Sequence, residues 1–127
     1  MINIKFYYCE ECDNIIEVTN SKNKDINLDK KNLKELVPNT VDAAVEKHVP
    51  CVELVGKNVK ISVGEVTHPM SEEHLIKAIY VVTEKGTVYR KYLNAGDEPV
   101  FEIENIDSNR FDVYAYCNLH GLWKNSI

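Results

Sequence analysis

RFDVYAYC (residues 110–117) is the stretch that decides the fold, because every second residue is apolar and suited to a core. A strand with a period of two would place four of its residues on one face, namely Phe111, Val113, Ala115 and Cys117. The alternation indicates a β-strand that buries one face. It also places a thiol at the end of that strand, where CNLHGLW begins.

Further strand signals lie upstream of this stretch. KNVKISVGEV places Val59, Ile61 and Val63 on one face. HLIKAIYVV and TVYRKYL flank TEKG (residues 83–86), which resembles the turn of a β-hairpin, and FEIENI adds a strand after the turn residues NAGDEP. Short strands at regular spacing, with turns between them, predict a small β-sandwich or barrel over residues 41–127.

The beginning of the chain has a different pattern. FYYCEECDNIIEV holds Cys9 and Cys12 between two short apolar runs, which predicts a turn flanked by two strands. The polar stretch SKNKDINLDKKN (residues 21–32) is typical of a loop. We therefore expect a small N-terminal domain over residues 1–37 and the β-sandwich over residues 38–127.

Helical signals are short and lie between these two regions. KNLKELVP predicts one helical turn before Pro38. In VDAAVEKH (residues 41–48) the apolar residues recur at helical spacing, Thr40 is a plausible N-cap, and Pro50 would end the helix. The sequence thus predicts one short helix that ends at a histidine.

Composition excludes several classes of function. The chain has 127 residues, enough for one modest core or for a domain with a small appendage. Its formal net charge is −5, and it lacks a lysine-rich block interleaved with aromatic residues, so we expect neither nucleic acid nor an anionic membrane as a partner. It has neither an apolar run long enough to span a membrane nor the charge order of a secretory signal, so we expect a cytoplasmic protein.

The histidines form the candidate site. Each lies where a predicted strand or helix gives way to a loop, in EKHVP, VTHPM, SEEHL and CNLHG: His48, His68, His74 and His120. A single histidine is more often a surface or hydrogen-bonded residue than a metal ligand. No histidine of the chain is left over for another role, however, and Cys117 stands three residues before the last of them. Together these five residues are candidate metal ligands.

The donor set narrows the metal. Structural zinc takes four ligands, so four imidazoles and a thiolate are one too many. Magnesium and calcium prefer oxygen ligands. Imidazole with thiolate suits iron, copper or nickel, and five protein ligands around an octahedral metal leave one open position. An open position on a redox metal predicts chemistry on a small molecule.

EKHVP, GEVTHPMSEEH and CNLHGLW, in this order and spacing, resemble the motifs of the desulfoferrodoxin and neelaredoxin family of superoxide reductases. FYYCEECDNIIEV resembles the start of the two-domain members, so the resemblance covers essentially the whole chain. It implies a mainly β protein with an immunoglobulin-like β-sandwich and a small desulforedoxin-like N-terminal domain. The implied activity is one-electron reduction of superoxide to hydrogen peroxide at one mononuclear iron per chain.

The resemblance also implies roles for individual residues. The four equatorial ligands would be His48, His68, His74 and His120, and the axial ligand would be Cys117. Glu46 would be the carboxylate that closes the sixth position in the oxidised state, and Lys47 the cation beside it. Reduction consumes electrons, so an external donor is implied, commonly rubredoxin, and a homodimer is the usual assembly.

The N-terminal region departs from the family pattern. Two-domain members hold a second iron with CxxC and a later pair of adjacent cysteines, but the corresponding region here is NLDKKNLKEL, without a thiol. We therefore expect the N-terminal domain to be metal-free. Cys9 and Cys12 would then be a vestige held by packing, a redox-active dithiol, or ligands of a metal shared between two chains.

Two further alternatives remain open. Cys51 lies three residues after His48 and is expected to be a small buried hydrophobe or, because it is near a source of peroxide, an oxidation sensor. In place of an enzyme, the chain could be a non-catalytic iron-binding or redox-sensing module on the same fold. Turnover with a reduced donor would distinguish the two functions.

Overall fold

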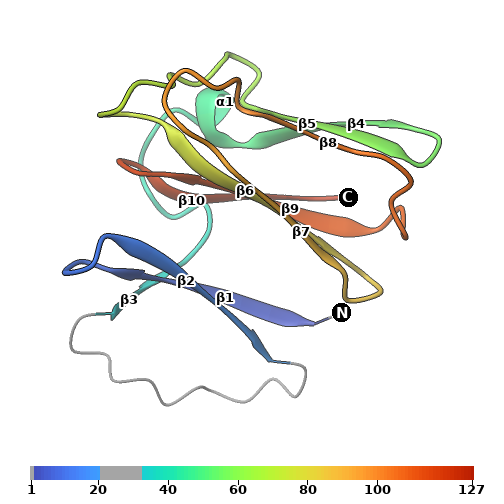
Figure 1. Ribbon diagram of the computed structural model, residues 1–127, viewed down its shortest axis with the longest axis horizontal. Helices are drawn as coiled ribbons and strands as arrows, with labels where there is room; N and C mark the ends of the chain where they lie inside the picture. Colours follow the sequence, from blue (N-terminus) through green and yellow to red (C-terminus); the bar gives the residue numbers. More distant parts are fainter. Residues whose placement is uncertain (1, 21–32) are drawn as a thin grey trace. The chain divides into compact units, whose positions relative to one another are not determined.

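The computed structural model describes residues 2–20 and 33–127, and the chain divides into two compact units, Met1–Val37 and Pro38–Ile127 (Figure 1). The loop expected over residues 21–32 lies outside the described residues. Within the described ranges, no helix combines the length and the apolar character that crossing a membrane requires.

The N-terminal unit is a three-stranded antiparallel sheet. Its strands are β1 (Asn3–Cys9), β2 (Asn14–Asn20) and β3 (Leu33–Leu36), in the order β2-β1-β3. Cys9 pairs with Asn14 at the end of the β1–β2 hairpin, so the CxxC motif forms the turn between two strands, as predicted.

The helical turn predicted just before Pro38 is wrong. LKEL forms β3 and pairs with β1, with Leu36 opposite Phe6 and Leu33 opposite Cys9. A run this short is a poor isolated helix, because nucleating a first turn costs more than one hydrogen bond returns. Pairing with an existing strand satisfies its backbone groups at lower cost.

The C-terminal unit is a β-sandwich with one short helix. One sheet has the order β10-β9-β6-β7 and the other β4-β5-β8, and they form two layers (Figure 1). The elements in chain order are α1 (Val45–His48), β4 (Pro50–Val55), β5 (Asn58–Val63), β6 (Ile76–Thr83), β7 (Val88–Tyr92), β8 (Val100–Ile103), β9 (Phe111–Cys117) and β10 (Gly121–Ser126).

The core lies between the two sheets and confirms the predicted strand faces. From β5 it contains Val59, Ile61 and Val63, and from β9 it contains Phe111, Val113, Ala115 and Cys117. The sequence prediction of a mainly β sandwich is therefore confirmed. The β6–β7 hairpin expected around TEKG is also present, with Val82 opposite Val88.

A β-bulge in β6 adjusts the strand beside the candidate site. The register with β9 shifts between Ile76, which pairs with Cys117, and Ala78, which pairs with Tyr116. Residues 76 and 79 would point to opposite faces of a regular strand, yet Ile76 and Ile79 both belong to the core. The extra residue of the bulge allows the Ile76 side chain to point into the core again. The regular pairing of β6 with β9 is interrupted there, next to Cys117.

The helix predicted over residues 41–48 is much shorter. α1 covers only Val45–His48, and the residue at its N-cap is Ala44, without a side-chain cap, rather than Thr40. Upstream, the side chain of Asn39 bonds the backbone of Lys124 in β10, accepting from its N–H at 2.9 Å and donating to its carbonyl at 3.2 Å. The segment before α1 is thus tied to a strand, and the helix begins only after it.

Candidate metal centre

The structure brings the five candidate ligands together from five points of the chain. His48 ends α1, His68 lies in the loop after β5, and His74 lies just before β6. Cys117 ends β9, and His120 lies in the turn between β9 and β10. Loops at the ends of sandwich strands thus supply most of the site, held by the sheets behind them.

Four of the five side chains are close enough to share one ion. These four each offer a ligand atom, and the atoms all lie within 4.8 Å of one another: His48, His74, Cys117 and His120. His68 is not part of that set but packs edge to face against two of its members. Its ring centroid lies 4.7 Å from that of His48 and 4.7 Å from that of His74.

A tight hairpin positions Cys117 and His120. Cys117 pairs with Gly121, so a loop of three residues joins β9 to β10. Gly121 has φ 79°, the left-handed conformation that closes such loops and that glycine adopts without strain. The resulting fold-back brings the Cys117 Sγ to 4.0 Å from the His120 Nδ1.

Backbone carbonyls orient two of the imidazoles. Nδ1 of His48 lies 2.6 Å from the Ala44 carbonyl, and Nδ1 of His68 lies 2.6 Å from the Pro69 carbonyl. A carbonyl oxygen only accepts, so each Nδ1 carries the proton and donates it. Nε2 of both rings is therefore left with its lone pair, the form in which imidazole binds a metal.

Two of the buried ring nitrogens lack a protein partner. Among the described residues, buried side-chain nitrogens that lack a hydrogen-bond partner include Nε2 of His68 and Nε2 of His74. Nε2 of His48 and Nδ1 of His120 face each other at 3.0 Å. Buried polar atoms normally find partners, so two unpartnered nitrogens in a histidine cluster fit a site for a cation. A cation bound by three Nε2 atoms, one Nδ1 and one Sγ would satisfy them all.

Burial favours the neutral form of three of the imidazoles. It lowers the pKa of His68 to about 4 and lowers the pKa of His48 and His74 as well. Neutral imidazole is the metal-binding form, so three of these histidines are ready to bind near neutral pH. Burial also raises the pKa of the Cys117 thiol, so a bound cation would have to displace its proton.

Glu46 and Lys47 precede His48 in α1, and both are exposed. The pKa of His48 and that of His74 are lowered mainly by burial, and the charge of Lys47 lowers both further. Lys47 is therefore near enough to act electrostatically on the cluster. The charge of Glu46 acts in the opposite sense on His48.

Gly64 allows the loop that carries His68 to dock on α1. A Cβ at this position would lie 2.6 Å from the carbonyl oxygens of both Lys47 and Val66, closer than real contacts allow. The docking is held by two backbone hydrogen bonds, from Gly64 N–H to the Val49 carbonyl at 3.1 Å and from Val66 N–H to the Glu46 carbonyl at 3.0 Å. The close approach sets where the loop lies relative to His48.

Trp123 is a supporting residue whose role the sequence analysis missed. Its buried indole stacks on His48, with ring centroids 5.0 Å apart, and its Nε1–H donates to the His120 carbonyl at 3.1 Å. The only signal in the sequence is its position three residues after His120. A single tryptophan at that spacing does not by itself indicate a ligand-orienting role.

Asn118 holds the segment that contains His74, and the sequence analysis missed it too. Its side-chain N–H donates to the Glu73 carbonyl at 2.9 Å, and its Oδ1 accepts from Leu75 N–H at 3.0 Å. The two bonds flank His74 on either side. The β9–β10 hairpin therefore positions a second histidine, His74, in addition to carrying Cys117 and His120.

The residues present fit an iron ion. Four imidazoles and one thiolate are too soft for magnesium or calcium and exceed the four ligands of a structural zinc. Nε2 of His68 and Nε2 of His74 lack protein partners, and the carbonyls that hold Nδ1 of His48 and Nδ1 of His68 leave Nε2 of those two rings with its lone pair. Mixed nitrogen and sulfur donors of this number suit iron.

Comparison with known proteins gives a consistent result. The profile of the desulfoferrodoxin family matches residues 40–126. The chain is 40% identical over 121 residues to a desulfoferrodoxin homolog of Archaeoglobus fulgidus, with 95% of each chain covered. It is 34% identical over 99 residues to a superoxide reductase of Pyrococcus abyssi, covering 65% of this chain and 86% of that one. The crystal structure of the superoxide reductase from Treponema pallidum matches with a TM-score of 0.76 at 27% identity, covering 98% of both chains.

Proposed function

The chain belongs to the desulfoferrodoxin family, and from this premise we propose that it is a superoxide reductase. In this proposal it holds one iron per chain and reduces superoxide to hydrogen peroxide, consuming one electron and two protons per turnover. The observation that carries the proposal is a cluster of three histidines and the Cys117 thiol whose ligand atoms lie within 4.8 Å of one another, with buried, unpartnered Nε2 atoms on His68 and His74. The resemblance to proteins named superoxide reductase supports the choice of reaction.

The five side chains would hold the metal through the atoms that the hydrogen bonds leave available. His48, His68 and His74 would bind through Nε2, and His120 through Nδ1. Cys117 would bind through Sγ, releasing its proton as the cation enters. When bound, ferrous iron supplies the single electron that reduces superoxide.

Cys117 and Lys47 would shape the electrostatics of the site. The neutral imidazoles add no charge, so the Cys117 thiolate is the negative ligand among the five, and its sulfur donates electron density to the metal. Lys47 lies on the exposed turn beside His48 and would attract an anion toward the site. That local field would oppose the formal net charge of −5 of the whole chain.

Glu46 would act after the electron has left. It lies next to Lys47 on the same exposed turn, and its carboxylate would serve as an additional ligand when the metal is oxidised. Reduction of superoxide would consume one electron per turnover, so we also propose an external one-electron donor such as rubredoxin. We also propose a cytoplasmic location, because four unevenly spaced cysteines do not make a secreted disulfide scaffold.

Metal analysis combined with visible spectroscopy tests the proposed site. We expect one iron per chain after anaerobic reconstitution, and an absorption band that appears on oxidation. Zinc could take four of these five side chains, so the measurement must use protein freed of zinc beforehand. Protein that takes up iron but remains inert toward superoxide with a reduced donor would favour a non-catalytic iron-binding module instead.

A further inference from the structure

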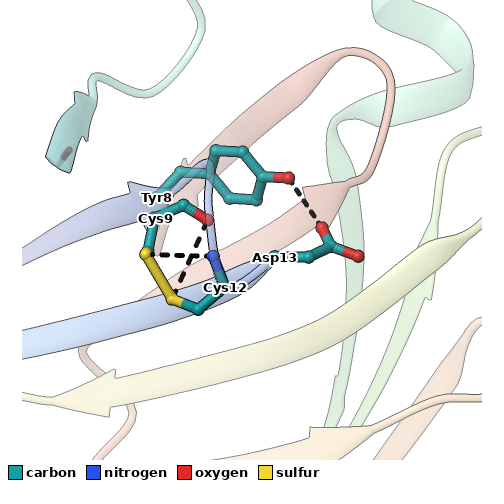
Figure 2. Close-up of a disulfide and its surroundings, with 4 residues drawn as sticks. All are labelled: Tyr8, Cys9, Cys12 and Asp13. Atoms are coloured by element: carbon teal, nitrogen blue, oxygen red, sulfur yellow. Dashed lines mark hydrogen bonds between the residues drawn. A yellow bond between two sulfur atoms is a disulfide. The ribbon is translucent and has the colours of Figure 1, made fainter.

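The N-terminal unit carries a second sulfur site, which the metal centre does not use. Cys9 and Cys12 form a disulfide across the β1–β2 turn, with Cα atoms 5.5 Å apart (Figure 2). The separation lies well within the usual range for disulfides, so the turn accommodates the bond. Cys12 is exposed and Cys9 is partly exposed.

A backbone hydrogen bond to one of the two sulfurs distinguishes the leaving sulfur from the attacked one. The Cys12 backbone N–H donates to the Cys9 Sγ at 3.3 Å, drawn as a dashed line in Figure 2. An amide donor stabilises a thiolate more than a thiol, so it favours Cys9 as the sulfur that leaves with negative charge. Cys12 is the more exposed of the two residues, so we take its sulfur as the one that an incoming thiolate reaches first.

The turn is also held by a contact that does not involve sulfur. The Tyr8 hydroxyl donates to Asp13 Oδ1 at 2.6 Å, joining the residue before Cys9 to the residue after Cys12 (Figure 2). That hydrogen bond raises the pKa of Tyr8, which keeps the hydroxyl protonated as a donor. Strand pairing continues on both sides, so opening the disulfide need not unfold the hairpin.

We propose that Cys9 and Cys12 form a reversible thiol–disulfide exchange site that accepts two electrons from a dithiol reductant. A thiolate of the reductant attacks Cys12 Sγ, the bond between the two sulfurs breaks, and Cys9 leaves as a thiolate beside the Cys12 N–H. The second thiolate of the reductant then attacks its own sulfur in the mixed disulfide and releases the Cys12 thiolate. The reductant ends as a disulfide, and the two thiolates of the turn take up protons from solvent.

Two other uses of the pair fit the structure less well. Residues 1–37 contain no further cysteine and no histidine, so the unit cannot complete a tetrahedral thiolate site from its own chain. A vestigial pair held by packing would be buried, because free cysteine behaves as a small hydrophobe, whereas Cys12 is exposed. Exposed disulfides are typically the labile and regulatory ones.

A redox titration of the full-length protein tests this site without reference to the iron. The protein is equilibrated anaerobically across ratios of reduced to oxidised dithiothreitol, quenched with acid and alkylated. Trypsin then releases residues 6–22, FYYCEECDNIIEVTNSK, which contains Cys9 and Cys12 and neither of the other cysteines. Mass spectrometry of this peptide therefore reports only the proposed pair.

We expect a single reversible transition in which both thiols of the peptide disappear together. Cys51→Ser should leave the transition unchanged. Cys9→Ser should abolish it and leave a Cys12 thiol that forms a mixed disulfide with oxidised glutathione. A peptide that stays fully alkylated at every ratio, or one that stays oxidised in excess reduced dithiothreitol, would overturn the proposal.

A metal shared between two chains is the remaining alternative, and zinc titration of the reduced protein tests it. We expect the N-terminal pair to bind zinc weakly or not at all. The parent and the Cys9→Ser, Cys12→Ser double variant should therefore bind the same amount of zinc per chain. One tightly bound zinc per two chains that is present in the parent and absent in the double variant would overturn the exchange site in favour of a metal bridge. Zinc bound at the histidine cluster should be the same in the parent and the double variant, so the difference between them reports only the N-terminal pair.

Discussion

The indole ring of Trp123 stacks on the imidazole of His48, with ring centroids 5.0 Å apart and planes 23° from parallel. The same indole donates its Nε1–H to the carbonyl of His120 at 3.1 Å. One buried side chain therefore orients a ring from α1 and a turn from the β9–β10 hairpin. Because the two histidines are far apart in sequence, Trp123 couples the positions of two candidate ligands.

We expect Trp123→Phe to weaken iron binding and Trp123→Ala to weaken it further. Phenylalanine keeps a ring over His48 but loses the hydrogen bond to His120, whereas alanine loses both. Residues that orient metal ligands typically account for about 10–100-fold in affinity. Competition with a chelator measures the change, and equal iron affinity in parent and both variants would contradict the orienting role.

Cys117→Ser should abolish the absorption band that we expect on oxidation, and should reduce superoxide reduction strongly. Serine replaces a soft, electron-donating thiolate with a harder and more weakly donating oxygen. Cys51→Ser is the matched control, because Cys51 is a partly buried free thiol outside the cluster. Retention of the parent spectrum in Cys117→Ser would remove this sulfur from the site.

Lys47→Ala should slow the capture of superoxide several-fold at low salt while leaving iron content unchanged. Lys47 would attract superoxide through its charge and would not bind the metal, so the effect on the rate should shrink as salt is added. Lys47→Arg keeps the charge and should behave like the parent. Lys60→Ala removes an exposed lysine from β5 and is the control for net charge. An equal loss of rate in Lys47→Ala and Lys60→Ala would show that only overall charge matters.

Gly64→Ala should destabilise the C-terminal unit by more than about 3 kcal/mol, because a left-handed backbone and a steric clash act together. Gly64 has φ 83°, and its Cβ would lie 2.6 Å from two carbonyl oxygens. Gly96 has φ 88° with nothing within 4 Å of its Cβ, so Gly96→Ala isolates the backbone cost of about 1 kcal/mol. Denaturant unfolding measures both, and equal losses would contradict the close approach to α1.

Thr87→Val should shift acid unfolding to higher pH. The Thr87 hydroxyl donates to Asp107 Oδ2, and this bond is the main reason that the pKa of Asp107 lies below its usual value. A lowered carboxyl pKa stabilises the fold above the unfolded-state pKa, and that stability is lost as the pH falls through the folded value. Thr87→Ser keeps the hydroxyl and should match the parent; coincident acid midpoints for all three proteins would contradict this linkage.

Strands in which apolar and polar residues alternate could be predicted from the sequence. Elements whose structure depends on pairing with another strand could not. Val59, Ile61 and Val63 identify β5 because one face of that strand is buried. β10 lacks such alternation, since it begins with glycine and its residues are held by pairing with β9. β3 was predicted as a helical turn because its local sequence cannot reveal the partner strand. The bulge at Ile76 also depends on register, which no local pattern reports.

The candidate ligands were visible in the sequence, but the groups that orient them were not. Histidine and cysteine are uncommon enough that their positions in loops pointed to one cluster. Nδ1 of His48 and Nδ1 of His68 are held by the carbonyls of Ala44 and Pro69, and every residue has a carbonyl. Which carbonyl faces which ring depends on backbone geometry, including the shortened α1. The disulfide between Cys9 and Cys12 fits only one of the three interpretations that the sequence allowed for the CxxC motif.

Single-turnover mixing of the reduced, iron-loaded protein with superoxide, without any donor, is the most direct measurement of the proposed function. We predict that one iron is oxidised and one hydrogen peroxide is formed for each superoxide consumed, and that the reaction then stops until a one-electron donor is added. Superoxide consumption that continues without a donor and releases oxygen faster than in the same mixture without protein would contradict the proposal, because it would indicate catalysed dismutation. An iron that stays reduced in the presence of superoxide would contradict it as well.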